Sequence, residues 1–363
     1  MTAIAGDAPT APDAPVVVDA PQRPSLRRML GGDAKVLFPL VLAIVVLSVY
    51  TGTENDAFLS WRNAENVMLQ SSVLGIVALG QTYLIAAGQL DLSVGSLASF
   101  IGVLGATMLA DGSSEAVMFI TCLVAGALVG LVWGLVVTKL RVPPFILTLG
   151  GLSVLQSMAL VRAGDVPVPA RGQLGWLNTG GLFGLRTPIL AFIVLALLSA
   201  FVMRYTRFGR QLFAVGSSEE ASYLAGLPTD RTKILAFVVN STFVAIAGMI
   251  LMARIGAGDP RAGTGLELKA IAAVVLGGAT LAGGRGSALG TFVGVVLLGV
   301  VGASLTFLDV DSSYEDMVFG GVLIFAVVMT ALGDRNDGSA RRLLGRLRRS
   351  GPSTPETQPQ GTK

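Results

Sequence analysis

Long apolar runs separated by short polar connections account for most of this chain. Most runs approach or exceed the roughly 20 mostly apolar residues that a helix needs to cross a bilayer, and several are shorter, such as 268–282 with 15 residues. The runs are residues 34–53, 67–87, 92–110, 116–138, 145–161, 188–205, 234–253, 268–282, 287–308 and 317–332. We therefore predict an all-α polytopic membrane protein with about ten transmembrane helices.

The composition excludes an ordinary soluble enzyme. Only 13% of the residues are charged, whereas soluble domains have about a quarter. No connection approaches the ~100 to 150 residues of an independent domain, so a catalytic domain would have to lie on another chain. The chain has no histidine and one cysteine, Cys122, so it lacks the commonest transition-metal ligand and cannot form an intrachain disulfide.

The termini differ from the apolar middle of the chain. We predict a disordered N-terminal tail over residues 1–34, a membrane domain over 35–332 and a basic C-terminal tail over 333–363. The first tail has no apolar core near its start, so it is not a cleaved signal peptide. The leucines among the arginines of 341–349 are compatible with a short helix that lies on an anionic leaflet. They are also compatible with a cluster of basic residues that simply follows the last crossing on the cytoplasmic side.

Lys and Arg are distributed unevenly between the two sides of the predicted bundle. If the N-terminus is cytoplasmic, the acidic connections near residues 54–65, 111–115 and 309–316 fall outside. Only seven of the 26 basic residues then fall outside: Arg62, Arg162, Arg171, Arg186, Arg254, Arg261 and Lys269. Cytoplasmic connections carry an excess of Lys and Arg, so we predict that both termini are cytoplasmic.

Residues 88–96 interrupt the apolar pattern between two crossings, and a broken helix or a re-entrant turn fits around residues 88–95. An acid such as Asp91 is costly at this depth unless it faces water, protein or a helix end. Asp91 is placed to cap a helix beginning at Leu92 or to contact substrate, and both roles stay open. Gly95 and Ser96 would permit another segment to approach closely.

Residues 277–287 form a second interruption, rich in glycine. A broken helix or a re-entrant turn fits around residues 277–286 as well. Gly290 and Gly294, which follow it, form a small-xxx-small pair and predict tight helix packing.

The longest predicted cytoplasmic connection covers residues 206–232. A serine of Ser217–Ser218 can cap a helix whose first turn carries Glu219–Glu220, where the helix dipole favours carboxylates. Gly226–Pro228 would end it after about two turns. Such a short helix is marginal in water, so it needs a surface, either on its own membrane domain or on a partner.

Five blocks resemble the permease subunits of ribose/xylose-type ABC monosaccharide importers, within the binding-protein-dependent transport system inner membrane component family. In order they are residues 91–96, 142–150, 208–216, 267–278 and 283–287. The resemblance covers about residues 60–332, so 35–332 would be the permease domain. The chain departs from the family pattern at Gln89–Leu90, Lys269 and 301–304, positions near the expected pathway, which leaves the cargo open.

The resemblance implies the transmembrane permease subunit of an ATP-driven sugar importer, a multi-pass protein of a bacterial inner membrane and not an enzyme. It implies that an ATPase-coupling site contains Arg210, Glu219, Glu220, Ala221, Ser222, Gly226 and Leu227. The expected substrate pathway contains Asp91, Ser93, Gly95, Ser96, Gly283, Gly284, Arg285, Gly286 and Ser287. We expect no catalytic residue and no metal ligand.

The implied partners are an ABC ATPase subunit, an extracytoplasmic sugar-binding protein and a second permease copy, in a homodimer or a paralogue heterodimer within the lipid bilayer. No nucleic acid is expected. The chain lacks a G-x-x-x-x-G-K-[ST] phosphate loop, so we expect it to bind no cofactor and the partner ATPase to use ATP and Mg²⁺.

Two other functions fit the same sequence. One is an ion- or proton-coupled secondary transporter with Asp91 as the carrier group. The other is an ABC permease for branched-chain amino acids or nucleosides. The first predicts uptake by this chain alone, driven by an ion gradient.

Overall fold

The computed structural model describes residues 26–170, 174–178, 180–182, 184–311, 314, 317–322, 324 and 328. The predicted C-terminal tail and residues 1–25 of the predicted N-terminal tail lie outside the described residues. Helix α1 (Leu26–Glu54) begins inside the segment that was predicted as a tail. Its first residues, Leu-Arg-Arg-Met-Leu, are all good helix formers, which accounts for the earlier start.

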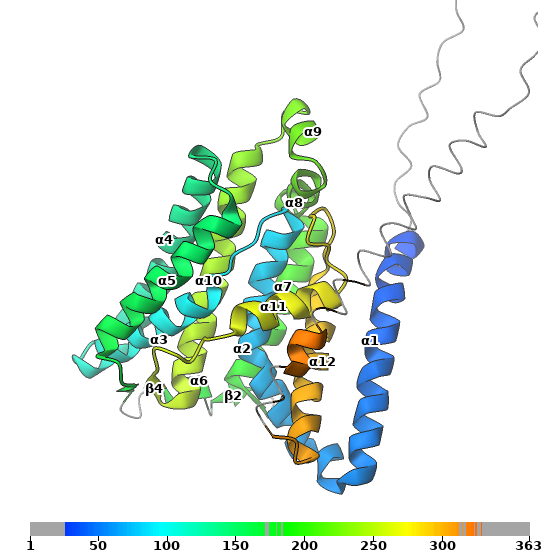
Figure 1. The fold of residues 1–363 in the computed structure, drawn as a ribbon, viewed down its shortest axis with the longest axis vertical. Coiled ribbons are helices and arrows are strands. Elements are labelled where there is room, and N and C mark those ends of the chain that lie inside the picture. The colour runs from blue at the N-terminus through cyan, green and yellow to red at the C-terminus, as the bar shows by residue number, and fades with distance from the viewer. Residues whose placement is uncertain are drawn as a thin grey trace, which may run out of the picture.

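The described residues form a bundle of helices with very little sheet, so the prediction of an all-α polytopic membrane protein is confirmed (Figure 1). Seven described helices are long and apolar enough to cross a membrane: α1, α2 (Trp61–Ala86), α4 (Glu115–Lys139), α5 (Pro144–Ala163), α7 (Thr187–Tyr205), α10 (Thr229–Ile255) and α12 (Ala288–Phe307). Helix α3 (Val94–Ala110) is slightly shorter, with 17 residues.

Helix α11 (Leu266–Leu276) has only 11 residues, although the apolar run predicted there extends to residue 282. Gly277 is its C-cap residue, and Gly278 has a φ of +90°, a left-handed conformation that glycine adopts without steric cost. The remaining elements are short: η1 (Asp56–Leu59), α6 (Gly175–Asn178), α8 (Arg207–Ser217) and α9 (Glu219–Leu224). Strand β1 (Val168–Pro169) pairs antiparallel with β4 (Ala257–Gly258), and β2 (Gly181–Leu182) pairs with β3 (Leu185–Arg186).

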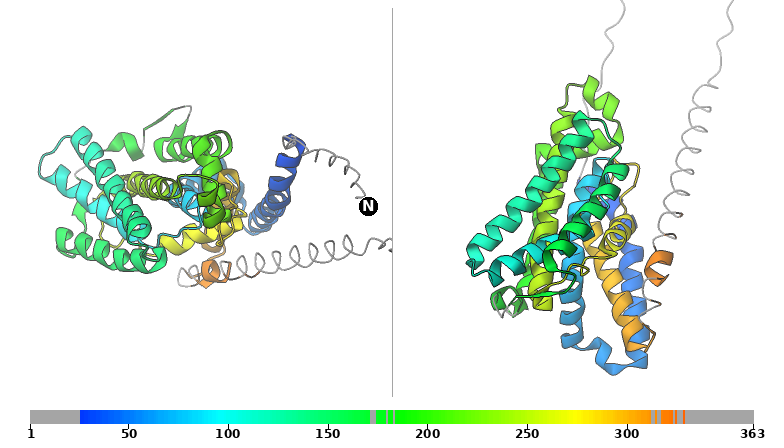
Figure 2. Two further views of the ribbon diagram at one scale, coloured as in Figure 1. Left: turned by 90° about the horizontal axis from the view of Figure 1, so that it is seen from above. Right: turned by 60° about the vertical axis from the view of Figure 1, so that its left-hand side comes forward.

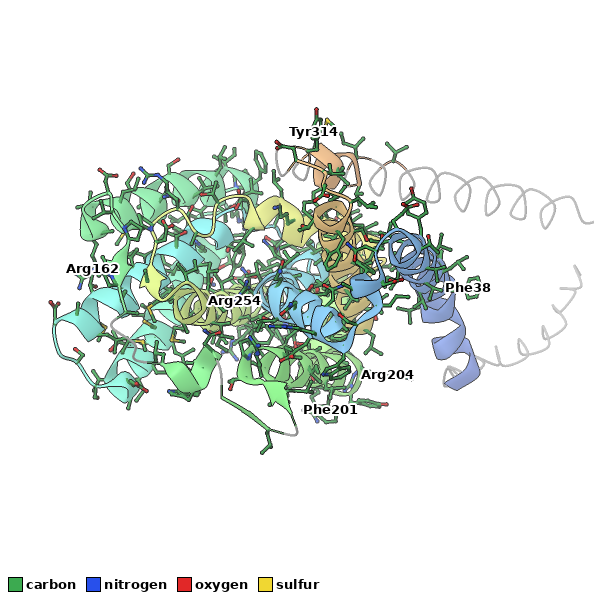
Figure 3. All side chains as sticks on the ribbon, turned by 90° about the horizontal axis from the view of Figure 1, so that it is seen from below. Phe38, Arg162, Phe201, Arg204, Arg254 and Tyr314 are labelled. Carbon is green, nitrogen blue, oxygen red and sulfur yellow. The ribbon has the colours of Figure 1, made fainter. Side chains whose placement is uncertain are left out.

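The long helices run between two ends of the bundle (Figures 1 and 2). Helices α8 and α9 lie at one end, whereas the short strands, α6 and η1 lie at the other. Helix α1 stands at one edge and packs against α12. Side chains such as Phe38 of α1 and Phe201 of α7 project from the rim, and this exposed apolar surface suits contact with lipid (Figure 3).

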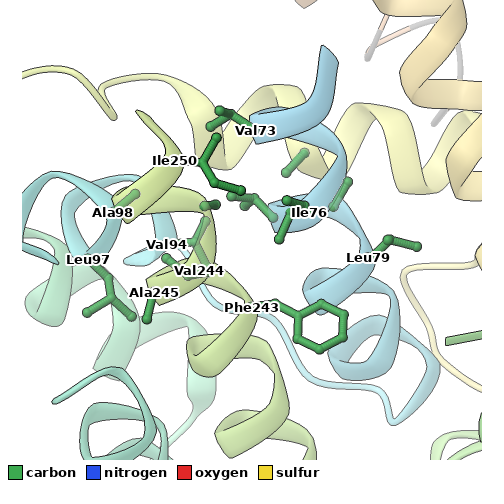
Figure 4. Packing of buried hydrophobic residues seen from close by; sticks show 14 of the residues in the cluster. Val73, Ile76, Leu79, Val94, Leu97, Ala98, Phe243, Val244, Ala245 and Ile250 are labelled. Atoms are coloured by element: carbon green, nitrogen blue, oxygen red, sulfur yellow. The ribbon is translucent and has the colours of Figure 1, made fainter. Parts of the chain in front are cut away.

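The core lies where α2, α3 and α10 meet (Figure 4). Ile76 and Leu79 of α2, Leu97 of α3 and Val244 of α10 are completely buried there. Helix α10 also packs along α4, so it lies at the centre of the described bundle. The two breaks described below are anchored on this core.

Closely spaced glycines permit the tightest helix contacts. Helix α4 has glycines at every fourth position (Gly126, Gly130 and Gly134), and each faces the backbone of α10. The predicted close packing at Gly290 and Gly294 is confirmed, because carbonyl oxygens of residues 273 and 277 near the end of α11 occupy the space that a Cβ atom would need.

Gly130→Leu is expected to destabilise the protein by roughly 1–3 kcal/mol, because a Cβ atom there would lie 2.5 Å from the carbonyl oxygen of Phe237 and force α4 away from α10. The measurement is the midpoint of thermal unfolding of the purified protein in detergent. Gly150→Leu on α5 is the matched control, since a Cβ atom there meets nothing within 4 Å. Equal midpoints for the two variants would contradict this account.

Candidate functional site

The chain leaves the helical conformation after α2 and re-enters it at Val94, so the break predicted in this region is confirmed. Helix α3 starts two residues later than predicted, with Ser93 at its N-cap position. The carboxylate of Asp91 explains this start. Its Oδ1 atom accepts hydrogen bonds from the backbone N–H of Ser93 at 2.8 Å and from the Ser93 hydroxyl at 2.6 Å, which forms a local turn before the helix.

Asp91 is completely buried and bonded on both sides of its carboxylate. The side-chain amide of Asn240, in α10, donates to Asp91 Oδ2 at 3.0 Å. Gln81, in α2, donates to the backbone carbonyl of Asp91. Hydrogen bonds of this kind offset the large cost of taking a carboxylate out of water. The carboxylate of Asp91 therefore joins the break to α10, and its backbone carbonyl joins the break to α2.

Two further bonds extend this arrangement outward. The indole N–H of Trp133, in α4, donates to the Ser93 hydroxyl at 3.1 Å. The backbone N–H of Leu92 donates to the hydroxyl of Thr148, in α5, also at 3.1 Å. Hydrogen bonds thus connect α2, α4, α5 and α10 to the segment that starts α3. We call this set the Asp91 network: Gln81, Asp91, Leu92, Ser93, Trp133, Thr148 and Asn240.

Sequence reasoning found Asp91 and Ser93 but missed their partners in the four other helices. The available signal was weak: Gln81, Thr148 and Asn240 are polar residues inside long apolar runs. Gly95 was expected to permit close approach, and this is confirmed, because a Cβ atom there would overlap the carbonyl oxygen of Gly263 and the carboxylate of Glu267. Ser96 is buried beside it.

The second break, predicted around residues 277–286, is also confirmed, and the non-helical segment covers 277–287. Gly283 and Gly284 have φ angles of +90° and +74°. Arg285 is exposed and Gly286 is half-buried. The Ser287 side chain accepts a hydrogen bond from Gly290 N–H at 3.3 Å and so caps α12.

The two breaks meet at the end of α2. The N–H of Gly284 donates to the carbonyl oxygen of Ala86 at 3.0 Å. A Cβ atom on Gly283 would lie 2.8 Å from the Cα atom of Gly88. Segments almost 200 residues apart in sequence are therefore in backbone contact.

The predicted cytoplasmic helix corresponds to α9, and Ser218 is the serine that caps it, accepting from the N–H of Ala221 at 3.2 Å. Ser222 is buried, whereas Glu220 is exposed. The chain turns after α9 at Gly226, with a φ of +77°. Leu227 then donates its N–H to the carbonyl oxygen of Ser222 at 3.0 Å, which closes the turn.

Glu219 lies against α10 instead of standing free. Its carboxylate is 2.5 Å from the Nζ atom of Lys233, whose side chain is only 9% exposed. Sequence reasoning did not identify Lys233 as part of this site. Helix α8, which precedes α9, was also missed; it carries Arg210, whose guanidinium donates to the carbonyl oxygen of Tyr205 at 3.2 Å.

Two apolar side chains of α9 have no cover in the described structure. Tyr223 and Leu224 are 70% and 78% exposed. Tyr223 also borders a groove of about 1300 Å³ between α9, the start of α10 and the connection from α4 to α5. Lys139 and Asp230, which line this groove, form an ion pair at 2.7 Å. This end of the bundle thus presents exposed apolar side chains beside a charged groove.

Comparison with known proteins identifies the chain's relatives. The family model described as branched-chain amino acid transport system / permease component matches residues 63–327. The ribose import permease protein RbsC of Escherichia coli K12 is 35% identical over 294 residues, which are 80% of this chain and 92% of that protein. No solved structure matches.

Two other relatives are named for different sugars. The L-arabinose ABC transporter permease protein AraH of Azospirillum brasilense is 34% identical, over 80% of this chain and 86% of that protein. The xylose transport system permease protein XylH of Haemophilus influenzae is 31% identical, over 81% of this chain and 96% of that protein.

The match spans α2 to α12, so it includes both breaks, the Asp91 network and α9. Permeases of bacterial ABC importers are non-catalytic subunits of the inner membrane, and a separate chain hydrolyses ATP. The seven long apolar helices described above agree with a multi-pass protein of that membrane. The chain therefore belongs to the branched-chain amino acid transport system / permease component family, as a non-catalytic permease subunit of an ABC importer.

Proposed function

We propose that this permease carries a neutral monosaccharide of the ribose or xylose type into the cell. One observation carries the proposal: relatives named for ribose, arabinose and xylose each align with about four fifths of this chain. The Asp91 network agrees with a neutral cargo. The one carboxylate inside the first break is already bonded to Ser93 and Asn240, so it is not available as a counter-ion.

The proposed assembly contains two permease copies, identical or closely related, each with about ten crossings of ~20 residues and with both termini in the cytoplasm. An ABC ATPase binds on the cytoplasmic side and a sugar-binding protein on the other. The sidedness is supported by the basic residues at the α9 end, Lys139, Arg141, Arg207 and Arg231. ATP and Mg²⁺ are bound by the ATPase, and this chain binds no cofactor.

We assign α9 and its flanks to ATPase coupling. Tyr223 and Leu224 dock on the ATPase, while Glu219 and the buried Ser222 hold the helix against its own subunit. Gly226 supplies the left-handed turn, and the exposed Glu220 faces the docking partner. The two breaks, 87–93 and 277–287, lie along the substrate pathway. ATP-driven movement of α9 then changes the relative stability of inward-facing and outward-facing states, as any such switch requires.

Reconstitution tests the function. The permease is co-expressed with the ATPase and the binding protein of its transport system, purified and incorporated into proteoliposomes. We expect uptake of radiolabelled ribose, xylose or arabinose that needs ATP, and no uptake of leucine or a nucleoside. Uptake of leucine would instead identify the protein as a permease for branched-chain amino acids. Accumulation by the permease alone, driven by an ion gradient, would identify a secondary transporter and refute the proposal.

Replacing Tyr223 and Leu224 together by alanine is expected to weaken ATPase binding at least about tenfold, because burying one such side chain is worth about 1.5–3 kcal/mol. Recovery of the ATPase with the detergent-purified permease measures this. Leu182→Ala is the control, since Leu182 is 61% exposed and lies at the opposite end of the bundle. Full recovery of the ATPase by the double variant would remove α9 from the docking surface.

A further inference from the structure

Three segments of backbone meet beside α9 with almost no side chain between them. They are the end of α2, the end of α8 and the second break. Their contacts centre on four residues, which we call the glycine junction: Gly88, Gly216, Gly283 and Gly284. The hydrogen bond from Gly284 N–H to the carbonyl oxygen of Ala86 ties the second break to α2 at this point.

Gly216 occupies the middle of the junction. A Cβ atom on Gly216 would overlap the carbonyl oxygen of Ala86 and would lie 2.6 Å from the backbone nitrogen of Gly284. A Cβ atom on Gly283 would lie 2.6 Å from the carbonyl oxygen of Gly216. The contacts are between backbone atoms, which cannot change rotamer to absorb a displacement.

The four glycines are required for different reasons. Gly88, Gly283 and Gly284 have φ angles of +70°, +90° and +74°, so a side chain would strain the backbone at each of them. Gly216 lies within helix α8 and has no such angle. The reason for glycine at position 216 is therefore space alone, and alanine there changes the contact without straining the local conformation.

The junction is joined directly to α9. Helix α8 ends at Ser217, and the next residue, Ser218, caps α9. The other side of α9 is fixed to α10 by the ion pair between Glu219 and Lys233. A displacement of α9 therefore reaches Gly216 through only two intervening residues, with no flexible linker.

The junction is also joined directly to both breaks. Gly88 starts the segment that leads to Asp91, and Gly283–Gly284 belong to the turn that leads into α12. Close-packed contacts transmit displacement instead of absorbing it.

We infer that the glycine junction is the contact through which α9 moves both breaks, and that Gly216 is a positioning residue for transport. This inference rests on the proposed function, in which the ATPase acts on α9. It adds the route inside the permease: from α9 through Gly216 to the end of α2 and to the turn before α12.

The test is Gly216→Ala in the complete complex with its ATPase and binding protein. We expect the ATPase to co-purify as with wild type and ATP hydrolysis to stay within about twofold, while sugar uptake per ATP falls about tenfold, which is a coupling loss near 1.4 kcal/mol. A merely structural defect would instead lower recovery and hydrolysis together. Gly150→Ala, where a Cβ atom meets nothing within 4 Å, is the matched control and should leave all three quantities unchanged.

A distance measurement covers the case in which Gly216→Ala fails to assemble. Spin labels are placed at Ala225→Cys, the exposed residue directly after α9 that is outside the proposed docking set, and at Leu281→Cys in the second break, in a Cys122→Ser background. A second pair joins Ala225→Cys to Leu140→Cys, after α4. On addition of ATP and a phosphate analogue, we expect the first distance to stay constant and the second to change, because α9 and the break move together.

Two results would overturn the inference: wild-type uptake per ATP in Gly216→Ala, or a change in the distance between residues 225 and 281 as α9 moves. Neither result would contradict the proposed function, because ATP-driven sugar uptake by the wild-type complex is measured alongside and tests that function separately. A wild-type complex that hydrolyses ATP without moving any sugar would refute the proposed function instead.

Discussion

Asp91→Ala is expected to cost roughly 3–6 kcal/mol of stability and to abolish ATP-driven uptake. The substitution removes a carboxylate that accepts from the Ser93 N–H, the Ser93 hydroxyl and the Asn240 amide, all of them buried. Each buried donor left without a partner costs about 1–3 kcal/mol. The measurements are the thermal unfolding midpoint in detergent and uptake in proteoliposomes. Asp111→Ala, an exposed position at the other end of α3, should behave as wild type.

Asp91→Asn separates a structural role for Asp91 from a carrier role. The Oδ1 atom of Asn240 has no hydrogen-bond partner among the described residues. Rotation of the Asn240 amide would let that oxygen accept from an asparagine at position 91, so the network can be rebuilt. We therefore expect Asp91→Asn to retain most of the stability and uptake that Asp91→Ala loses. Equal loss in the two variants would show that the negative charge itself is required, as in an ion-coupled carrier.

The membrane helices and the two breaks could be predicted from local sequence. A bilayer sets the length of an apolar run, and hydropathy alone therefore located the seven long helices, although α1, α2 and α10 begin eight, six and five residues earlier than predicted. Both breaks were also predictable from local sequence, because glycines and polar residues interrupt the apolar runs there. The cap on α9 was predictable because Ser218 stands immediately before two glutamates.

The partners within the site could not be predicted in this way. Asn240 and Asp91 are 149 residues apart, and nothing in the sequence near either residue indicates the other. The ion pair between Glu219 and Lys233 depends on the turn at Gly226, which brings the start of α10 back against α9. Helix α8 was missed because it contains Gly209 and Gly216, which are poor helix formers; the structure requires both for close backbone contacts.

Lys233→Glu is expected to lower ATP-driven uptake about a hundredfold. The Lys233 side chain is 9% exposed, so the substitution places a nearly buried carboxylate beside that of Glu219. Breaking a buried pair costs about 3–5 kcal/mol, and we take about 3 because Glu219 is 55% exposed and partly screened by water. Each 1.4 kcal/mol changes an equilibrium constant tenfold. If the docked position of α9 loses about 3 kcal/mol of stability, its population, and with it the rate of uptake, falls about a hundredfold.

The charge-swapped double variant, Glu219→Lys with Lys233→Glu, tests whether the pairing itself matters. It restores opposite charges at the same two positions, and we expect uptake to recover to within about tenfold of wild type. Lys139→Glu is the matched control, because Lys139 and Asp230 form a pair with side chains 62% and 44% exposed, and such surface pairs contribute at most about 1 kcal/mol. Uptake that stays as low in the double variant as in Lys233→Glu, or that falls equally in Lys139→Glu, would mean that charge at this end of the bundle matters but the bond holding α9 to α10 does not.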